Sequence, residues 1–261
     1  MTGPCFPSLQ RRALPPGVLD ALETSDCREP AGRKEAVLLD AAQQVFLEHG
    51  YSGASVDDIV VKAGISKATL YKYFCEKEAL FSAVIQRVCR EQQALFNALT
   101  FNESTEDALI EGSKMAIDFM TSPLAVDIFR MCVAETKRFP QVGHIFYVSA
   151  SFVMEQHLIT LFERAEEAGD LVIRDKLLAS NQFWQLCRTD YFYAMLLNLR
   201  DSISREERDS LVRSTLEMFV GHYGTEPFKS RLAERLKDLP QVMTSSDAHQ
   251  PSDDASQGAD R

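Results

Sequence analysis

The sequence has no apolar run long enough to cross a membrane, which requires about 20 consecutive residues. It also lacks the apolar block of a secretory signal, because Pro4, Pro7, Pro15 and Pro16 interrupt the N-terminal segment. We therefore expect a soluble cytoplasmic protein with no membrane partner.

The six cysteines, at positions 5, 27, 75, 89, 132 and 187, include no Cys-x-x-Cys pair. This excludes the usual zinc and thioredoxin spacings, and a cytoplasmic location disfavours disulfides. We expect buried small hydrophobes or incidental tail residues. Redox sensing by Cys132 or Cys187 is the alternative. No acidic or cysteine residue stands at ligand spacing from His144 or His157, so we predict no metal site.

Signatures of catalysis are also missing. The chain contains no phosphate-binding Gly-rich loop, no His-Glu-x-x-His and no Gly-x-Ser-x-Gly. The paired carboxylates Glu166-Glu167 and Glu206-Glu207 are typical of a solvated helix surface. We expect neither an enzyme nor a cofactor.

Negative charge dominates the chain, whose formal net charge is −10. The residues from Arg33 to Arg90 differ from the rest, with eight Lys and Arg against seven Asp and Glu. Lysines recur there at 62, 67, 72 and 77. A local basic stripe, and not the whole-chain charge, is what binds a polyanion.

Helical periodicity covers nearly all of residues 33–238, and no segment alternates as a strand. We predict an all-α protein with a flexible arm (1–32), an N-terminal three-helix helix-turn-helix domain (33–92), a larger helical ligand-binding and dimerisation domain (93–238) and a disordered acidic tail (239–261). The expected helices are 34–49, one each after Ser55 and Ser66, one from Lys77, then 105–120, 123–137, 141–168, 175–199, 204–223 and 226–238. In the first, Val37/Leu38, Ala41/Ala42 and Val45/Phe46 form an apolar stripe; from Lys77 on, Leu80, Phe81, Val84, Val88 and Phe96 do the same.

Residues 55–74 have the length and punctuation of a helix-turn-helix. Ser55 is a typical N-cap with Asp58 three residues on, Gly64 ends the first helix, and Ser66 caps the second. The outer face of the second helix is polar and aromatic, with Lys67, Thr69, Tyr71, Lys72 and Tyr73. Such a face suits a recognition helix in the major groove. An ordinary helical hairpin with a solvated lysine face is the alternative.

Four segments of this region resemble the N-terminal domain of TetR-family regulators. They are Gly50-Tyr51, Ser55-Val56-Asp57-Asp58-Ile59, Ala63-Gly64-Ile65-Ser66-Lys67-Ala68-Thr69-Leu70-Tyr71-Lys72-Tyr73-Phe74 and Lys77-Glu78-Ala79-Leu80-Phe81. The resemblance covers Arg33 to Phe81. Ala68 departs from the commoner glycine, and Cys75 stands where a small polar or turn residue is usual.

This resemblance implies double-stranded DNA as the partner and assigns roles in binding it. Ser55 would contact a phosphate, and the helix N-terminus at Ser66 and Lys67 would offer amide donors. Lys67, Ala68 and Thr69 would lie over base edges, and Tyr71 would touch the backbone and a thymine methyl. Lys72 belongs to the same phosphate-facing surface, and Tyr73 and Lys77 would clamp phosphates.

A second resemblance joins Phe129-Arg130, Ala134-Glu135-Thr136-Lys137-Arg138-Phe139-Pro140, Phe146-Tyr147 and Gly169-Asp170-Leu171 to the AefR-like C-terminal domain within the TetR family. It implies a helical regulatory domain that forms a homodimer and binds an unidentified small-molecule effector. The residues expected at the dimer interface are Leu177, Phe183, Leu186, Met195, Leu211, Thr215, Met218 and Phe219. They could equally fill the core of one protomer, because periodicity does not separate the two cases.

An effector pocket between helices would be mostly apolar with a few polar groups. The candidate lining residues are His144, Tyr147, His157, Trp184, Gln185, Arg188, Tyr191 and Tyr193. Each of them could instead be an ordinary packed or solvated side chain.

Two functions follow from these observations. The first is a homodimeric, ligand-responsive repressor that binds a near-palindromic operator. The second is an all-helical ligand-binding or catalytic protein whose helix-turn-helix serves only in packing. The outer face of residues 67–73 favours the first, because a packing hairpin would carry apolar groups there.

Overall fold

The computed structural model describes residues 32–100, 104–147 and 153–240, and side chains outside 92–100 and 153–154. The expected arm before residue 32, the expected tail after residue 240, Cys5, Cys27 and the side chain of Phe96 therefore lie outside the described part. Leu239, expected in the tail, packs against the core instead. Within it, the chain is helical apart from short connections and one isolated bridge between Leu171 and Gly224. The helices are α2 Arg33–Gly53, α3 Val56–Ala63, α4 Lys67–Tyr73, α5 Lys77–Thr100, α6 Thr105–Met120, α7 Pro123–Thr136, α8 Pro140–Phe146, α9 Val153–Glu167, α10 Lys176–Cys187, α11 Asp190–Leu196, α12 Arg205–Tyr223 and α13 Glu226–Leu236.

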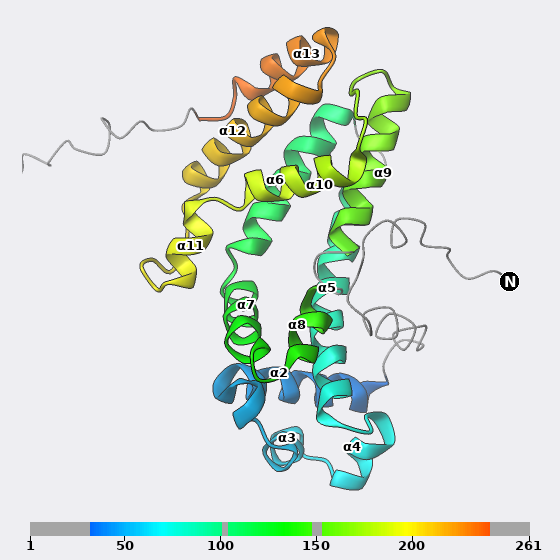
Figure 1. Cartoon of the computed structure of the whole chain (residues 1–261), viewed down its shortest axis with the longest axis vertical. Coiled ribbons are helices and arrows are strands. Elements are labelled where there is room, and N and C mark those ends of the chain that lie inside the picture. Colours follow the sequence, from blue (N-terminus) through cyan, green and yellow to red (C-terminus); the bar gives the residue numbers. More distant parts are fainter. Residues whose placement is uncertain (1–31, 101–103, 148–152, 241–261) are drawn as a thin grey trace, which may run out of the picture.

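The N-terminal helices α2, α3 and α4 lie at one end of the molecule, and α5 leads from them toward the other helices (Figure 1). Helix α2 continues past the expected stop at Gly50, but it kinks there, with φ 70° and ψ 172° at that glycine. The apolar stripe of α2 is buried except at Val37, which is 42% exposed. The expected burial of Val37 is wrong, because the face of α2 that contacts the core is narrower than its stripe of apolar residues.

The core around α2 is closed by residues far along the chain. Phe46, Tyr51 and Phe81 pack with ring centroids 5.0 to 6.0 Å apart. The same buried cluster includes Ile128, Met131 and Cys132 from α7 and Val142 and Ile145 from α8. The N-terminal helices therefore rest directly on α7 and α8.

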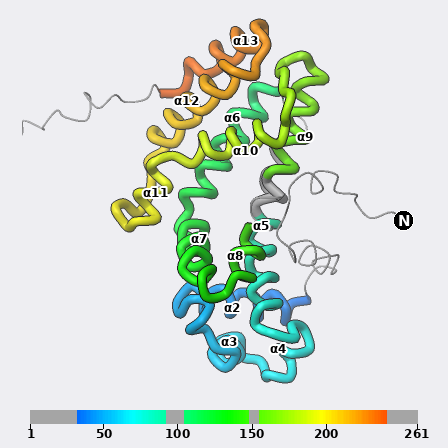
Figure 2. Tube along the Cα trace, viewed as in Figure 1, coloured from blue at the N-terminus to red at the C-terminus, as the bar shows by residue number. Residues whose placement is uncertain are grey.

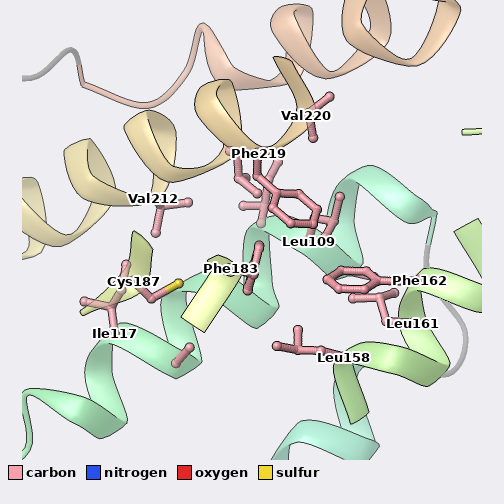
Figure 3. Packing of buried hydrophobic residues seen from close by; sticks show 14 of the residues in the cluster. Leu109, Ile117, Leu158, Leu161, Phe162, Phe183, Cys187, Val212, Phe219 and Val220 are labelled. Carbon is pink, nitrogen blue, oxygen red and sulfur yellow. The ribbon is translucent and has the colours of Figure 1, made fainter. Parts of the chain in front are cut away.

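A second core lies among α6, α9, α10, α12 and α13. Phe162 stacks on Phe219 with centroids 5.2 Å apart, and Phe183 meets the edge of Phe219 at 5.0 Å. Figure 3 shows these three rings gathered around Leu109, with Leu158 and Leu161 below them. Stacked and edge-to-face aromatic pairs of this kind stabilise a core beyond their buried area.

One expected helix is in fact two. The segment 175–199 breaks after Cys187, where Arg188 has φ −90° and ψ 82°, and α11 then begins at Asp190. Neither glycine nor proline marks the break, so the sequence pattern did not reveal it. The break turns Phe192 onto Phe129 of α7, with ring centroids 5.2 Å apart.

The other expected helices agree within a few residues, and the trace in Figure 2 follows them from end to end. The expected helix 141–168 appears as α8 and α9, on either side of residues 148–152, which lie outside the described part. None of the described helices combines the length and the apolarity that a membrane crossing needs.

Candidate nucleic-acid interface and regulatory cavity

The helix-turn-helix has the caps that its sequence predicts. The Ser55 hydroxyl accepts a hydrogen bond from the Asp58 amide at 3.0 Å, and the Ser66 hydroxyl accepts one from the Thr69 amide at 3.1 Å. Gly64 stands between the two helices in the left-handed region, with φ 64°. A side chain there would be strained, so glycine permits the tight turn that sets the angle between α3 and α4.

Most of the outer face of α4 points away from the core, although Tyr73 is partly buried against it. Lys67, Ala68, Tyr71 and Lys72 are exposed, and Tyr71 leaves 51% of its surface accessible. Thr69 is partly buried, and its hydroxyl oxygen lies 2.9 Å from the hydroxyl oxygen of Ser66. The inner residue Leu70 anchors the helix at 1% exposure.

Two of the four lysines in the basic stripe are paired within the domain. The Lys67 ammonium lies 2.6 Å from an Asp57 carboxylate oxygen, and this hydrogen bond raises the pKa of Lys67. Lys62 lies 2.6 Å from Glu48 and, by its hydrogen bond, lowers the pKa of that carboxyl. This ion pair connects α4 to α3, so a DNA phosphate would compete with the Asp57 carboxylate for the Lys67 ammonium.

Lys77 points into the domain. Its ammonium donates to the Tyr51 carbonyl at 2.8 Å and the Ala54 carbonyl at 3.1 Å, and it lies 4.6 Å from the centre of the Tyr51 ring. Two of its three donors therefore hold the end of α2 on the start of α5. The phosphate role expected from the sequence stays a prediction, and it would fall to the remaining donor.

We expect Lys77→Ala to destabilise the domain as well as weaken DNA binding. Loss of the ammonium leaves two carbonyls without their donor, at roughly 1 kcal/mol each. Thermal unfolding followed by circular dichroism should show a melting temperature several degrees lower. Lys72→Ala, which removes an exposed lysine, is the matched control and should leave it unchanged. Equal melting temperatures for the two variants would contradict the structural role of Lys77.

The kink of α2 is also the contact point with the larger domain. One Glu135 carboxylate oxygen accepts hydrogen bonds from the Ser52 amide at 3.0 Å and the Ser52 hydroxyl at 2.8 Å. A β-carbon on Gly50 would come within 3.2 Å of the same oxygen. Phe139 meets the edge of the Tyr51 ring at 5.1 Å. Glu135 and Phe139 stand in the segment that resembles the AefR-like domain, but the resemblance assigns them no role.

A cavity of about 420 Å³ opens among α7, α8, α9 and α10. Four of the residues expected in a pocket line it: Tyr147, Trp184, Gln185 and Arg188. Its other lining residues come from the same helices: Phe129, Gly143, Phe146, Glu155, Leu158, Ser180 and Asn181. A smaller apolar hollow adjoins it and shares Phe129, Phe146, Trp184 and Arg188.

The remaining pocket candidates lie elsewhere. His144 and His157 are partly buried outside the cavity lining, and burial lowers the pKa of His157. The Arg200 guanidinium covers the Tyr191 ring at 4.9 Å, and Tyr193 is 49% exposed. These four side chains do not line the cavity that Trp184 and Arg188 line, because helical periodicity does not say which neighbour each face meets. Their role in ligand binding stays a prediction.

Comparison with known proteins finds a matching family model for each of two segments of the chain. Residues 38–84 match the model of bacterial regulatory proteins of the tetR family, and residues 107–225 match that of the AefR-like transcriptional repressor C-terminal domain. The solved structure of the flavonoid-responsive regulator FrrA is 30% identical, with a TM-score of 0.63, and the match covers 75% of this chain and 100% of that one. The chain belongs to the TetR family.

Further TetR-family relatives share the fold or the DNA-binding end. A transcriptional regulator from Mesorhizobium loti has a TM-score of 0.64 at 24% identity, covering 76% of this chain and all of its own. The HTH-type transcriptional activator FasR of Mycolicibacterium smegmatis is 43% identical over 60 residues, and the repressor ComR of Escherichia coli is 40% identical over 75. These matches span only 27% and 36% of the two curated proteins. Activators and repressors thus share this segment.

Several residues expected at the dimer interface of this TetR-family chain are internal. Thr215 is 2% exposed and donates to the Leu186 carbonyl at 3.1 Å, and Phe219 is 1% exposed. Phe183 and Met195 are buried too, so these four side chains pack inside the protomer, and a part for them in a dimer interface stays a prediction. Met218 is 62% exposed and stays available, with Leu177, Leu186 and Leu211 partly buried.

The described cysteines bear on redox sensing. Burial raises the pKa of Cys89, Cys132 and Cys187 to about 12. A thiol with so high a pKa is almost entirely protonated at neutral pH and reacts slowly with oxidants. Of the described cysteines Cys75 alone is exposed. The alternative role of Cys132 and Cys187 as sensors is disfavoured on this ground.

Proposed function

We propose that this TetR-family protein is a homodimeric repressor that releases its operator when a small molecule occupies the cavity among α7, α8, α9 and α10. The observation that carries the DNA-binding part is the outer face of α4. Its exposed lysine and tyrosine side chains have no role in the core, although the helix is firmly capped and anchored by Leu70. A hairpin that served only in packing would bury this face.

Specific residues take the DNA contacts in this proposal. Lys67, Ala68 and Thr69 read base edges near the start of α4, and Tyr71 touches the backbone and a thymine methyl. Phosphates are held by the Ser55 hydroxyl, by the amides of the helix N-terminus at Ser66 and Lys67, and by the flanking groups Lys72, Tyr73 and Lys77. Two copies related by a two-fold axis place two such helices in successive major grooves.

A path for the ligand signal runs through α7 and α8. Phe129 of α7 and Phe146 of α8 line the cavity. Glu135 in the last turn of α7 and Phe139 in the connection to α8 contact Ser52 and Tyr51 beside the kink of α2. A ligand that favours another position of α7 and α8 would thereby tilt α2 and the helix-turn-helix, provided it binds the two states with different affinity. FrrA is described as flavonoid-responsive, which supports a small-molecule effector.

Repression and not activation is the proposed direction. The model that matches residues 107–225 is described as a transcriptional repressor, and it spans the regulatory part of the chain. The match to the activator FasR is confined to 60 residues.

The function is tested by fluorescence anisotropy with labelled DNA from upstream of the protein's own gene. We expect sequence-selective binding that weakens steeply between two salt concentrations, because phosphate contacts release counterions. An unrelated duplex of equal length is the control. Absence of salt-sensitive, selective binding would favour the alternative, a helical ligand-binding or catalytic protein with a structural helix-turn-helix.

For the dimer we propose the outward faces of α10 and α12, which pack side by side. Leu178 on α10 is 52% exposed and Met218 on α12 is 62% exposed. Gly221, one turn beyond Met218, has open space around its β-carbon position, so a helix of a second copy can approach closely there. Large exposed apolar side chains gathered beside a small residue suit a four-helix contact across a two-fold axis.

We expect Met218→Arg to dissociate the dimer. Burying an unpaired charge costs several kcal/mol, and a two-fold interface carries it twice, so the dimer dissociation constant should rise about 100-fold or more. Sedimentation velocity across a concentration series measures it. Val133→Arg is the matched control, because Val133 is 61% exposed on α7. If Met218→Arg remains as dimeric as that control, the interface lies elsewhere.

A further inference from the structure

One face of α10 forms the floor of the cavity. Asn181, Trp184, Gln185 and Arg188 all line it, at the spacing i, i+3, i+4 and i+7 that places side chains along a single helix face. Asn181 and Arg188 are separated by about two turns, or roughly 10 Å along the axis. The floor therefore carries polar groups at its two ends and Trp184 between them.

Arg188 marks one end with a cation that has no anionic partner among the residues that the structure describes. Its guanidinium lies 5.6 Å from the centre of the Phe129 ring and 5.0 Å from that of Phe192. Its Nε atom is buried without a hydrogen bond, and burial lowers the pKa of Arg188. Within the described residues no carboxylate forms an ion pair with it. A guanidinium presents planar donors that match a carboxylate in two parallel hydrogen bonds.

Glu155 marks the other end. It is 9% exposed, and one carboxylate oxygen lies 3.4 Å from the Asn181 amide nitrogen, which also donates to the Leu177 carbonyl at 2.7 Å. An ionised carboxylate only accepts hydrogen bonds. A ligand group that reaches this end must therefore donate, as a hydroxyl does.

The walls between the two ends are aromatic and aliphatic. Phe129, Phe146, Leu158 and Trp184 face the cavity. Flat apolar walls of this kind favour a planar ring system, which gains edge-to-face or stacked contacts.

We infer that the effector is an aromatic hydroxycarboxylic acid, with its carboxylate on Arg188 and its hydroxyl donating toward Glu155. This inference rests on the proposed function, since it names the ligand class of the same cavity. A neutral ligand would leave the partly buried Arg188 charge without a counterion, and a cationic ligand would meet it as a like charge. A carboxylate pairs with the Arg188 guanidinium, and a distant hydroxyl can donate to a carboxylate oxygen of Glu155.

The test compares three probes by isothermal titration calorimetry: 6-hydroxy-2-naphthoate, its methyl ester and 2-naphthoate. We expect the hydroxy acid to bind about tenfold or more tightly than the ester, because a charge-assisted pair is lost in the ester. The 2-naphthoate, which lacks the hydroxyl, should fall between them. Trp184 is the single tryptophan of the chain, so energy transfer from it to the bound naphthoate reports that the probe occupies this cavity.

Two variants test which residue binds the carboxylate and which binds the hydroxyl of the probe. Arg188→Met replaces the guanidinium with an apolar side chain of similar length and should abolish the preference for acid over ester. Glu155→Gln should keep that preference and reduce the difference in affinity between the hydroxy acid and 2-naphthoate. Arg174→Met is the matched control, because Arg174 is exposed outside the cavity lining. Circular dichroism melts check that each variant is folded, and the comparison of acid with ester on the unmodified protein stands without any variant.

Three outcomes overturn the inference: equal binding of acid and ester, a preference that survives Arg188→Met, or no binding of the acid. Operator binding is measured separately by anisotropy. If the protein binds its operator and rejects the acid, the ligand class is wrong and the DNA-binding proposal stands. If the acid binds with the expected preference but leaves operator affinity unchanged, the ligand class stands and the proposed response is wrong.

Discussion

Replacing Tyr71 with alanine should reduce operator affinity by about 30-fold to 1,000-fold. A lost phosphate contact and thymine-methyl contact together cost about 1–2 kcal/mol per half-site, and a two-fold dimer carries the loss twice. The side chain is 51% exposed and makes no core contact, so unfolding stability should not change. Fluorescence anisotropy with the upstream DNA gives the affinity, and a thermal melt gives the stability.

Two companion variants make the Tyr71 result specific. Tyr71→Phe keeps the ring and removes the hydroxyl, so it separates the methyl contact from the phosphate contact. Tyr193→Ala removes a tyrosine of similar exposure, 49%, from α11, outside the helix-turn-helix, and should leave operator affinity unchanged. A Tyr71→Ala protein that binds the operator as tightly as the Tyr193→Ala protein would remove Tyr71 from the DNA interface.

Replacing Glu135 with alanine should uncouple the regulatory cavity from DNA binding. The carboxylate accepts both hydrogen bonds from Ser52, so its loss releases the kink of α2 from the C-terminal end of α7. Allosteric coupling is typically worth about 1–3 kcal/mol, which corresponds to roughly a 5-fold to 150-fold effect of ligand on DNA affinity. We expect most of that effect to vanish. The measurement is the ratio of operator affinities with and without saturating 6-hydroxy-2-naphthoate.

A ligand-free readout supports the Glu135 experiment. Amide hydrogen exchange of residues 50–55 should accelerate in Glu135→Ala, because the Ser52 amide loses its acceptor. Ser52→Ala removes one of the two hydrogen bonds and should have a smaller effect in the same direction. Glu111→Gln is the control, since Glu111 pairs with Lys114 within α6. Unchanged exchange and an unchanged affinity ratio in Glu135→Ala would exclude this contact from the signal path.

The DNA-binding helices could be predicted closely because their signals are local. Ser55 and Ser66 each cap the amide three residues on, and Gly64 adopts the positive φ that the turn needs. Such interactions are complete within a few residues, so the sequence specifies them without knowledge of the rest of the chain. The same holds for α12, where Ser204 and Glu207 form a capping box.

The partners of the charged side chains in that domain could not be predicted from the sequence. Lys67 pairs with Asp57 on the neighbouring helix, and Lys77 reaches the Tyr51 and Ala54 carbonyls 26 and 23 residues away. A count of charges along the chain treats all lysines alike. Their partners depend on how the helices cross, which residue spacing does not encode.

By itself, the sequence determined an all-α chain with a capped helix-turn-helix and an outer face suited to DNA, because helix periodicity, N-caps and turn glycines act locally. Only the tertiary structure decided that Arg188, the residue after α10, lies near the Phe129 and Phe192 rings and that Glu135 accepts a hydrogen bond from the Ser52 hydroxyl. It also decided that Phe219 belongs to one protomer's core. An apolar stripe says that a helix face is covered, but the partner that covers it is chosen by the packing of helices remote in sequence.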